Sequence, residues 1–140
     1  MAVHVLTVLA YKDGDSVTSQ FLAGSVNTNP VTIRRLLLEL QKARLVETRK
    51  GAGFGSRLSR SPKKIDLAEV YRAVEDEEPF IFPVKKPDAD CPVGQCIQSM
   101  LTRVFTAAEQ ALERELSCTT LSDIVDRVKR TCKRSHKESV

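Results

Sequence analysis

The stretch that decides the fold is residues 29–60, NPVTIRRLLLELQKARLVETRKGAGFGSRLSR. It opens on Asn29-Pro30, which predicts a helix N-cap followed by a proline at the first helical position. Apolar residues then recur at helical spacing and predict one buried stripe, formed by Ile33, Leu36, Leu37 and Leu40. Two short runs around a three-glycine turn predict a β-hairpin over residues 45–60. A helix followed by a basic hairpin is the layout of a winged helix-turn-helix.

The residues before this stretch fit the same layout. Residues 2–11 are largely apolar and end at Lys-Asp-Gly-Asp, which predicts a first short helix. Residues 17–23 predict a second helix with Phe21 and Leu22 facing inward, and residues 24–28 predict a turn. A short helix, a tight turn and a helix with exposed Thr and Arg give the helix-turn-helix order. The predicted fold class is therefore mostly α with a small β-hairpin wing.

Positive charge is concentrated on the same part of the chain. The 140 residues include 22 Lys and Arg against 18 Asp and Glu, a net charge of +4. Residues 34–64 hold ten basic and two acidic residues, a net charge of +8, which leaves −4 for the rest. A solvated basic face is the alternative interpretation, but clustering on a helix and a hairpin favours contact with phosphates.

The expected DNA contacts lie at the start of the third helix and on the hairpin. An arginine on the exposed face would read guanine O6 and N7, whereas Arg34 or Arg35 could instead pair with a phosphate or with Glu39. The hairpin residues would meet the DNA backbone or the minor groove and position the protein. The candidates are Thr28, Asn29, Val31, Thr32, Arg34, Arg35, Arg49, Lys50, Ser56 and Arg57.

A fourth helix and a loop follow the hairpin. Asp66 with Glu69 three residues later predicts a capping box, and the helix that it starts is expected to pack on the winged domain. The predicted DNA-binding domain therefore covers residues 1–75. Residues 76–92 carry several prolines and acidic residues and are predicted to be a loop or linker.

The longest helical pattern covers residues 93–116, roughly 36 Å at about 1.5 Å per residue. Its 4-3-4-3 apolar spacing is typical of helix pairing, so we expect a homodimer, and a single broad face toward the chain's own core is the alternative. The expected dimer contacts are Ile97, Leu101, Val104, Phe105, Ala108, Ala111 and Leu112. The predicted dimerisation helices cover residues 93–130, and residues 131–140 are a basic tail that is expected to fray.

The chain has four cysteines, Cys91, Cys96, Cys118 and Cys132. In a cytoplasmic protein they are expected to be reduced thiols or ligands and not a disulfide framework. Cys91 and Cys96 are separated by four residues, which is not the C-x2-C spacing typical of a zinc site. Three interpretations stay open: inert side chains at a helix start, a redox-sensing thiol pair, or a metal or cluster site. The start of a helix is where thiols become reactive, which favours a redox role.

Other function classes find little support. No apolar run approaches membrane-spanning length and the first residues lack the order of a signal peptide, so we expect a cytoplasmic protein. An aromatic content of 5% without tryptophan argues against a stacking platform for single-stranded nucleic acid. The chain has two histidines and neither a P-loop nor a nucleophile elbow, so no enzyme activity is expected. No metal and no cofactor are expected either.

The chain resembles the IscR/NsrR/CymR-type family of bacterial winged helix-turn-helix transcription regulators, and within that family the YwnA-like branch. The resemblance implies a homodimer held by the long helix, with recognition helices in successive major grooves of a near-palindromic site, and it implies repression. It covers nearly the whole chain and is carried by SVNTNPV (25–31), LQKARLV (40–46), the wing (49–58), IDLAEVYRAV (65–74), CPVG (91–94) and TLSDI (120–124).

Two departures from that family affect the expectations. Glycine is common in the family where Arg44 stands, so the turn into the wing is expected to differ. Cluster-binding members use three closely spaced cysteines before the long helix, whereas only Cys91 and Cys96 lie there, and an iron–sulfur cluster normally needs four ligands. We therefore expect a sequence-specific regulator of double-stranded DNA that responds to redox state through this pair. The alternatives are a winged-helix protein-interaction module and a regulator that senses an iron–sulfur cluster.

Overall fold

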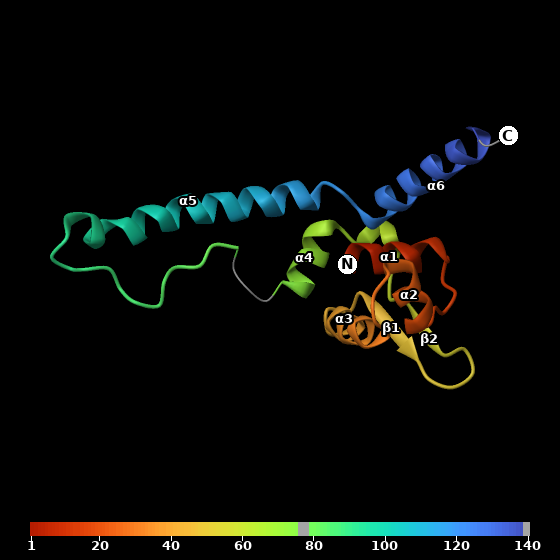
Figure 1. The fold of residues 1–140 in the computed structure, drawn as a ribbon. Helices are drawn as coiled ribbons and strands as arrows, with labels where there is room; N and C mark the ends of the chain where they lie inside the picture. Colours follow the sequence, from red (N-terminus) through yellow and green to blue (C-terminus); the bar gives the residue numbers. More distant parts are fainter. Residues whose placement is uncertain (76–78, 139–140) are drawn as a thin grey trace.

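The computed structural model describes residues 1–75 and 79–138, which form a helical domain with one small sheet and a long projecting helix (Figure 1). Residues 76–78 of the predicted loop and residues 139–140 of the predicted tail lie outside the described residues. The predicted fold class, mostly α with a β-hairpin wing, is confirmed. The elements are α1 (Ala2–Tyr11), α2 (Ser19–Val26), α3 (Pro30–Lys42), β1 (Val46–Arg49), β2 (Gly55–Leu58), η1 (Pro62–Lys64), α4 (Leu67–Val74), α5 (Pro92–Ser117) and α6 (Leu121–Glu138).

The second helix, α2, begins two residues later than predicted. Val17 forms a β-bridge with Ser56 and is therefore extended, and Thr18 is the N-cap, whose Oγ1 accepts a hydrogen bond from Phe21 N–H at 3.2 Å. Leu22 is fully buried as predicted, but Phe21 is 50% exposed. The prediction that Phe21 faces inward is wrong, because Leu22 and Ala23 form the buried side of α2 and the Phe21 ring lies at the surface, with Lys12 Nζ 4.9 Å from its centroid.

α2 also continues through the predicted turn and ends at Asn27. Asn27 has a φ of 60°, and its N–H donates to Gly24 O at 3.3 Å. Thr28 N–H donates to Ala23 O at 2.9 Å, which completes a Schellman C-cap. Asparagine tolerates this left-handed conformation, so the helix ends at Asn27 and not at Gly24. The turn that follows is tight, and it places α3 directly after α2.

α3 is capped at both ends. Asn29 Oδ1 accepts a hydrogen bond from Val31 N–H at 2.8 Å, which confirms the predicted N-cap. At the other end Arg44 has a φ of 58° and Leu45 N–H donates to Leu40 O at 2.9 Å, again a Schellman arrangement. The turn into the wing therefore keeps the left-handed geometry usual for glycine, although arginine occupies the position. The buried stripe of α3 is Ile33, Leu37 and Leu40, with Leu36 half-buried.

The wing is a two-stranded antiparallel hairpin in which Arg49 lies opposite Gly55. The segment before α2 is bonded to its second strand: Val17 N–H donates to Ser56 O at 2.9 Å, and Ser56 N–H donates to Val17 O at 2.8 Å. The backbones approach so closely that a Cβ on Gly55 would lie 2.8 Å from Val17 O. Glycine is thus required there, and the wing is fixed to the helical domain.

α4 packs against α3 and begins at the predicted cap. Asp66 Oδ1 accepts a hydrogen bond from Glu69 N–H at 2.9 Å. The Glu69 carboxylate pairs with Arg60, which follows the wing. The predicted capping residue and the predicted packing of α4 on the winged domain are both confirmed. The segment between the wing and α4 includes the single turn η1.

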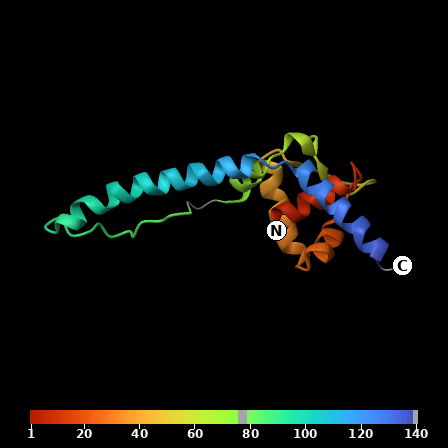
Figure 2. The same ribbon diagram turned by 90° about the horizontal axis from the view of Figure 1, so that it is seen from above.

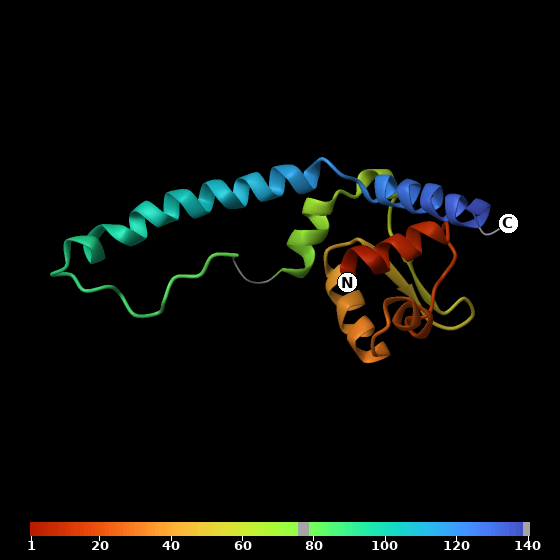
Figure 3. The same ribbon diagram turned by 45° about the horizontal axis from the view of Figure 1, so that its top comes forward.

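α6 returns to the winged domain and lies along α1 (Figure 3). The joint between α5 and α6 is bonded to the start of α4: Leu67 N–H donates to Thr119 O at 3.0 Å, and Leu121 N–H donates to Ile65 O at 2.8 Å. α6 therefore packs on its own domain, and the grouping of both helices into one dimerisation unit stays a prediction. It also continues to Glu138, so the first part of the predicted frayed tail is helical.

One core holds these elements together. Its buried side chains come from α1, α2, α3, the wing, α4 and α6, and together they remove a continuous apolar surface from water. Within the described residues no helix is long and apolar enough to cross a membrane. The fully buried large side chains are Val5, Leu6, Leu9, Leu22, Ile33, Leu40, Leu45, Val46, Ile65, Val70 and Leu121.

α5 projects away from this core, and residues 79–91 run back along it as an extended arm (Figures 1 and 2). The ring of Phe80 stacks on the ring of Phe105 with centroids 4.6 Å apart, and the Phe82 ring lies 5.5 Å from the same ring. None of the side chains of α5 is buried. The aromatic contacts therefore fix the arm to one face of the helix.

The apolar residues of α5 lie in two stripes that differ in exposure. The half-buried apolar residues lie on the arm side and toward α4, and they are Leu101, Phe105, Ala108 and Leu116. A second stripe, with 4-3-4-3-4 spacing, is open to solvent and consists of Val93, Ile97, Met100, Val104, Ala107 and Ala111. The predicted dimer set mixes the two, because a periodic pattern does not say which face the chain's own arm covers.

Candidate functional site

The exposed face of α3 carries most of the candidates predicted for the helix. Thr32, Arg34 and Arg35 are exposed, and Val31 is 49% exposed, so all four can meet a partner. Thr28 is half-buried in the turn, and Asn29 uses its side chain as the N-cap. These last two residues position the helix start, where free backbone N–H groups favour an anion.

The two arginines lie on different sides of α3. Arg34 lines a groove between α3 and the wing, whereas Arg35 lines a hollow with Glu75 and the N-terminal residue Met1. Glu39 pairs with Lys42, at 2.9 Å between Nζ and Oε1. Among the residues that the structure describes, neither Arg34 nor Arg35 forms an ion pair with Glu39 or with another acidic side chain.

The DNA contacts predicted on the wing differ in whether they already have a partner within the described part of the chain. Arg49 and Lys50 are exposed and, within the described part of the chain, make no ion pair. Arg57 lies opposite Glu47 in the hairpin register and pairs with it across the strands. Ser56 is 2% exposed and its hydroxyl is hydrogen-bonded to that of Thr48, so its role as a DNA contact stays a prediction.

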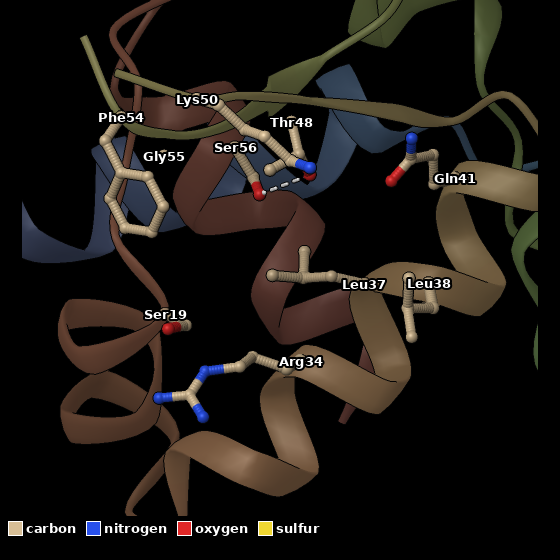
Figure 4. A pocket seen from close by; sticks show the side chains of 10 residues that line it. All are labelled: Ser19, Arg34, Leu37, Leu38, Gln41, Thr48, Lys50, Phe54, Gly55 and Ser56. Carbon is tan, nitrogen blue, oxygen red and sulfur yellow. Dashed lines mark hydrogen bonds between the residues drawn. The ribbon is translucent and has the colours of Figure 1, made fainter. Parts of the chain in front are cut away.

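The α3–wing groove has a volume of about 490 Å³ (Figure 4). Within its lining the Thr48 and Ser56 hydroxyls are hydrogen-bonded at 3.1 Å. None of the ten lining residues is acidic, and two are cationic. The residues that line it are Ser19, Arg34, Leu37, Leu38, Gln41, Thr48, Lys50, Phe54, Gly55 and Ser56.

Seven of these residues are absent from the set of DNA contacts predicted from sequence: Ser19, Leu37, Leu38, Gln41, Thr48, Phe54 and Gly55. Leu38 and Phe54 are each 58% exposed, which is unusual for large apolar side chains. Phe54 was detectable, because it is the only aromatic residue among the glycines of the wing. Leu38 could not be found from the sequence, because it lies next to the buried stripe of α3 and the helical pattern does not show that it faces the groove.

The cysteine pair lies at the start of α5, far along the chain from the groove. Cys91 is the N-cap and is half-buried, and Cys96 is exposed in the second turn. Within the described residues no three His, Cys, Asp or Glu side chains gather to hold a metal ion. Two thiols do not fit an iron–sulfur cluster, which takes four ligands. The expectation that the protein binds no cofactor stays a prediction.

The comparisons with known proteins agree with this geometry. The family model described as "Rrf2: Iron-dependent Transcriptional regulator" matches residues 1–127. YwnA from Bacillus subtilis (strain 168), a proposed HTH-type transcriptional regulator, is 37% identical over 126 residues, which are 90% of this chain and 92% of YwnA.

Solved structures share the fold. The crystal structure of a proposed DNA binding protein is 38% identical, has a TM-score of 0.70 and covers 88% of this chain and 94% of its own. The structure of IscR from T. potens is 23% identical, with a TM-score of 0.69 over 93% of this chain and 84% of its own. These relatives are regulators and not enzymes. With residues 1–127 matched, the chain belongs to the Rrf2 family of transcriptional regulators.

Proposed function

We propose that the protein is a sequence-specific double-stranded DNA-binding regulator that acts as a homodimer in the cytoplasm and represses its targets. The observation that carries this proposal is the exposed cationic face of α3 beside a cationic, acid-free wing groove. Thr32, Arg34 and Arg35 would enter the major groove and read base edges. Arg49 and Lys50 would contact phosphates on either side and set the register.

The open stripe on α5 supports the homodimer. Met100 is 65% exposed and Val104 is 61% exposed, and both lie on one straight apolar face of a 26-residue helix. A monomer rarely leaves such a surface in water, and the spacing fits helix pairing. Two copies joined here would present two α3 helices to a site with two half-sites. Repression follows from the family resemblance, since a dimer on a promoter blocks access to it.

Cys91 and Cys96 are proposed as a redox sensor. A peroxide or disulfide would take two electrons and two protons from the two thiols and leave a disulfide between them. The residues are five apart, more than one helical turn of 3.6 residues, so the bond would unwind the first turn of α5. That change lies on the dimer helix, which links it to the spacing of the two α3 helices.

The test is binding of the reduced, purified protein to the promoter fragment upstream of its own coding region, followed by fluorescence anisotropy while salt is raised. We expect site-specific binding that weakens steeply with salt, because phosphate contacts release counterions. Arg34→Ala should cost about 1–3 kcal/mol of binding free energy. Lys85→Ala, which removes an exposed cation from the arm, is the matched control and should leave binding unchanged.

Two outcomes would contradict parts of this function. Binding that is no stronger than that of a generic polycation, in random-site selection as well, would favour a protein-interaction module. Specific binding that is identical before and after mild oxidation, with a Cys91→Ser variant as reference, would keep the DNA-binding regulator and remove the redox sensor.

A further inference from the structure

The α3–wing groove has features that DNA contact alone does not require. Its volume of about 490 Å³ lies within the roughly 300–1,000 Å³ typical of small-molecule pockets. Leu37 forms a buried wall, and Leu38 and Phe54 add exposed apolar surface around it. A DNA backbone offers phosphates and sugars, which gain little from a ring and two leucines. The apolar lining therefore fits a ligand with an apolar body of its own.

The charges around the groove are unbalanced. Arg34 and Lys50 come from opposite sides, α3 and the wing, and within the described residues neither makes an ion pair. Figure 4 shows both side chains around the space that Phe54 and Leu37 border. A negative charge placed beside Lys50 would form a charge-assisted hydrogen bond, and Arg34 would add longer-range attraction from the other end of the groove. The Gln41 amide and the Ser19 hydroxyl add polar groups that can orient such a ligand.

We propose that this groove is an effector site for a small organic anion with a flat apolar body, an aromatic carboxylate being the simplest example. The carboxylate binds Lys50, and the ring lies between Phe54 and the leucines of α3. Bound there, the ligand occupies Lys50 and the space beside α3 that DNA needs, so ligand and DNA exclude each other. This second part rests on the proposed DNA-binding function, whereas the first part does not.

The direct test is a titration of the full-length reduced protein with 2-naphthoate, followed by backbone amide shifts in ¹H–¹⁵N spectra. We expect saturable shifts confined to the α3–wing groove, with a dissociation constant of about 1 mM or tighter. Acetate carries the charge without the ring, and 2-naphthamide carries the ring without the charge, and each should bind at least roughly tenfold more weakly. Shifts along the open stripe of α5, or no saturable shift, would overturn the proposal.

Matched variants locate the site. Phe54→Ala removes an exposed ring from the groove and should weaken 2-naphthoate about fivefold or more. Phe21→Ala removes a comparably exposed ring from α2, where Lys12 Nζ lies 4.9 Å from its centroid, and should change nothing. Lys50→Gln should weaken 2-naphthoate and leave 2-naphthamide as it was. Equal effects of the two phenylalanine variants would place the ligand elsewhere and overturn the proposal.

The competition test adds 2-naphthoate to the protein–promoter complex, with acetate at the same ionic strength as the control. A fall in DNA affinity with 2-naphthoate alone supports competition, and the coupling must be reciprocal, so DNA should also weaken 2-naphthoate. Groove shifts without any effect on DNA affinity would overturn the competition. A protein that shows groove shifts but never binds specific DNA would keep the ligand site and contradict the proposed function instead.

Discussion

Arg44 has a left-handed backbone conformation that favours glycine over a residue with a long side chain. Its φ of 58° completes the C-cap of α3, and arginine in this region carries a penalty of about 1–2 kcal/mol that glycine does not. Arg44→Gly should therefore raise the free energy of unfolding by about 1 kcal/mol, measured by urea denaturation. Arg35→Gly, in the right-handed interior of the same helix, is the control and should lower it by about 1 kcal/mol. A loss of stability in both variants would contradict this account of the turn.

The wing arginines should separate in a DNA-binding assay. Arg49 is free, so Arg49→Ala should reduce the slope of log affinity against log salt by about 1. Arg57 already pairs with Glu47, so Arg57→Ala should change the slope less. The measurement is fluorescence anisotropy at several salt concentrations with one promoter fragment. Equal effects would mean that Arg57 leaves Glu47 when DNA binds.

The sequence predicted which side chains are exposed on α3, but it did not predict which wing residues already have partners within the chain. Thr32, Arg34 and Arg35 are exposed on α3 as expected. The sequence did not show that Ser56 is bonded to the segment before α2 or that Arg57 pairs across the hairpin, because both partners are distant in sequence. A run of basic residues shows the total charge, but it does not show which cations are already paired.

At the scale of the element, Gly55 allows the wing to lie against the segment before α2. Gly55→Ala places a Cβ 2.8 Å from Val17 O in a backbone with φ of 143°, so the wing must shift. It should lower the free energy of unfolding by about 2 kcal/mol or more and weaken DNA binding. Gly24→Ala is the control: it lies inside α2 with no atom within 4 Å of the new Cβ, and should stabilise by about 0.5–1 kcal/mol. Circular dichroism in urea measures both.

The start of α6 has a pH-dependent cap. Thr120 N–H donates to the Asp123 carboxylate at 2.9 Å and Asp123 N–H donates to Thr120 Oγ1 at 3.2 Å. The backbone hydrogen bond from Thr120 lowers the pKa of Asp123 below its usual value. A lowered folded-state pKa adds stability above the unfolded-state value, and that stability is lost as pH falls through the folded-state pKa. Asp123→Asn should thus be less stable than the parent at neutral pH, with the difference closing in acid.

Thermal unfolding of both proteins from neutral pH to acid checks this. Asp126→Asn, three residues further into α6, is the comparison variant and should follow the parent. A constant gap between Asp123→Asn and the parent at every pH would contradict the assigned role of the cap.

Elements whose signals are local were predicted well. The caps Asn29 and Asp66 and the glycine turn identify α3, α4 and the wing, because each signal lies within a few residues of its effect. The start of α2 was misplaced, since Val17 is held extended by the distant wing. The sequence did not separate the two stripes of α5 for the same reason: Phe80 and Phe82 of the arm lie on Phe105, which is distant from them in sequence.

At the scale of the whole molecule, the open stripe of α5 should control assembly. Val104→Glu places a charge in the middle of that stripe and should convert a dimer to a monomer, because an unpaired buried charge costs several kcal/mol. Thr102→Glu, exposed on the same helix but off the stripe, should leave the assembly unchanged. Light scattering coupled to size-exclusion chromatography measures the mass, and a dimeric Val104→Glu protein would exclude this face as the contact.

The order of the elements could be predicted from the sequence, but the packing of distant elements on one another could not. The order of short helices, wing and long helix was predicted and is confirmed, whereas the packing of α6 on α1 was missed. An amphipathic helix shows that it must bury one face, and it does not show against which neighbour. The pairing of Ile65 with Leu121 joins parts of the chain that no local pattern connects.

The joint between α5 and α6 has a mechanical consequence. α5 has 26 residues, so it is a lever of roughly 39 Å whose inner end is fastened by the hydrogen bonds around Ile65 and Thr119. A change of about 5° in its angle moves the outer end by roughly 3.4 Å, the rise of one base pair. In a dimer that forms through α5, the two backbone hydrogen bonds at this joint would limit the angle between α5 and the winged domain. That angle would set the distance between the two α3 helices, and so the number of base pairs between two half-sites. Operator spacing would then be a property of the joint, and base identity a property of α3.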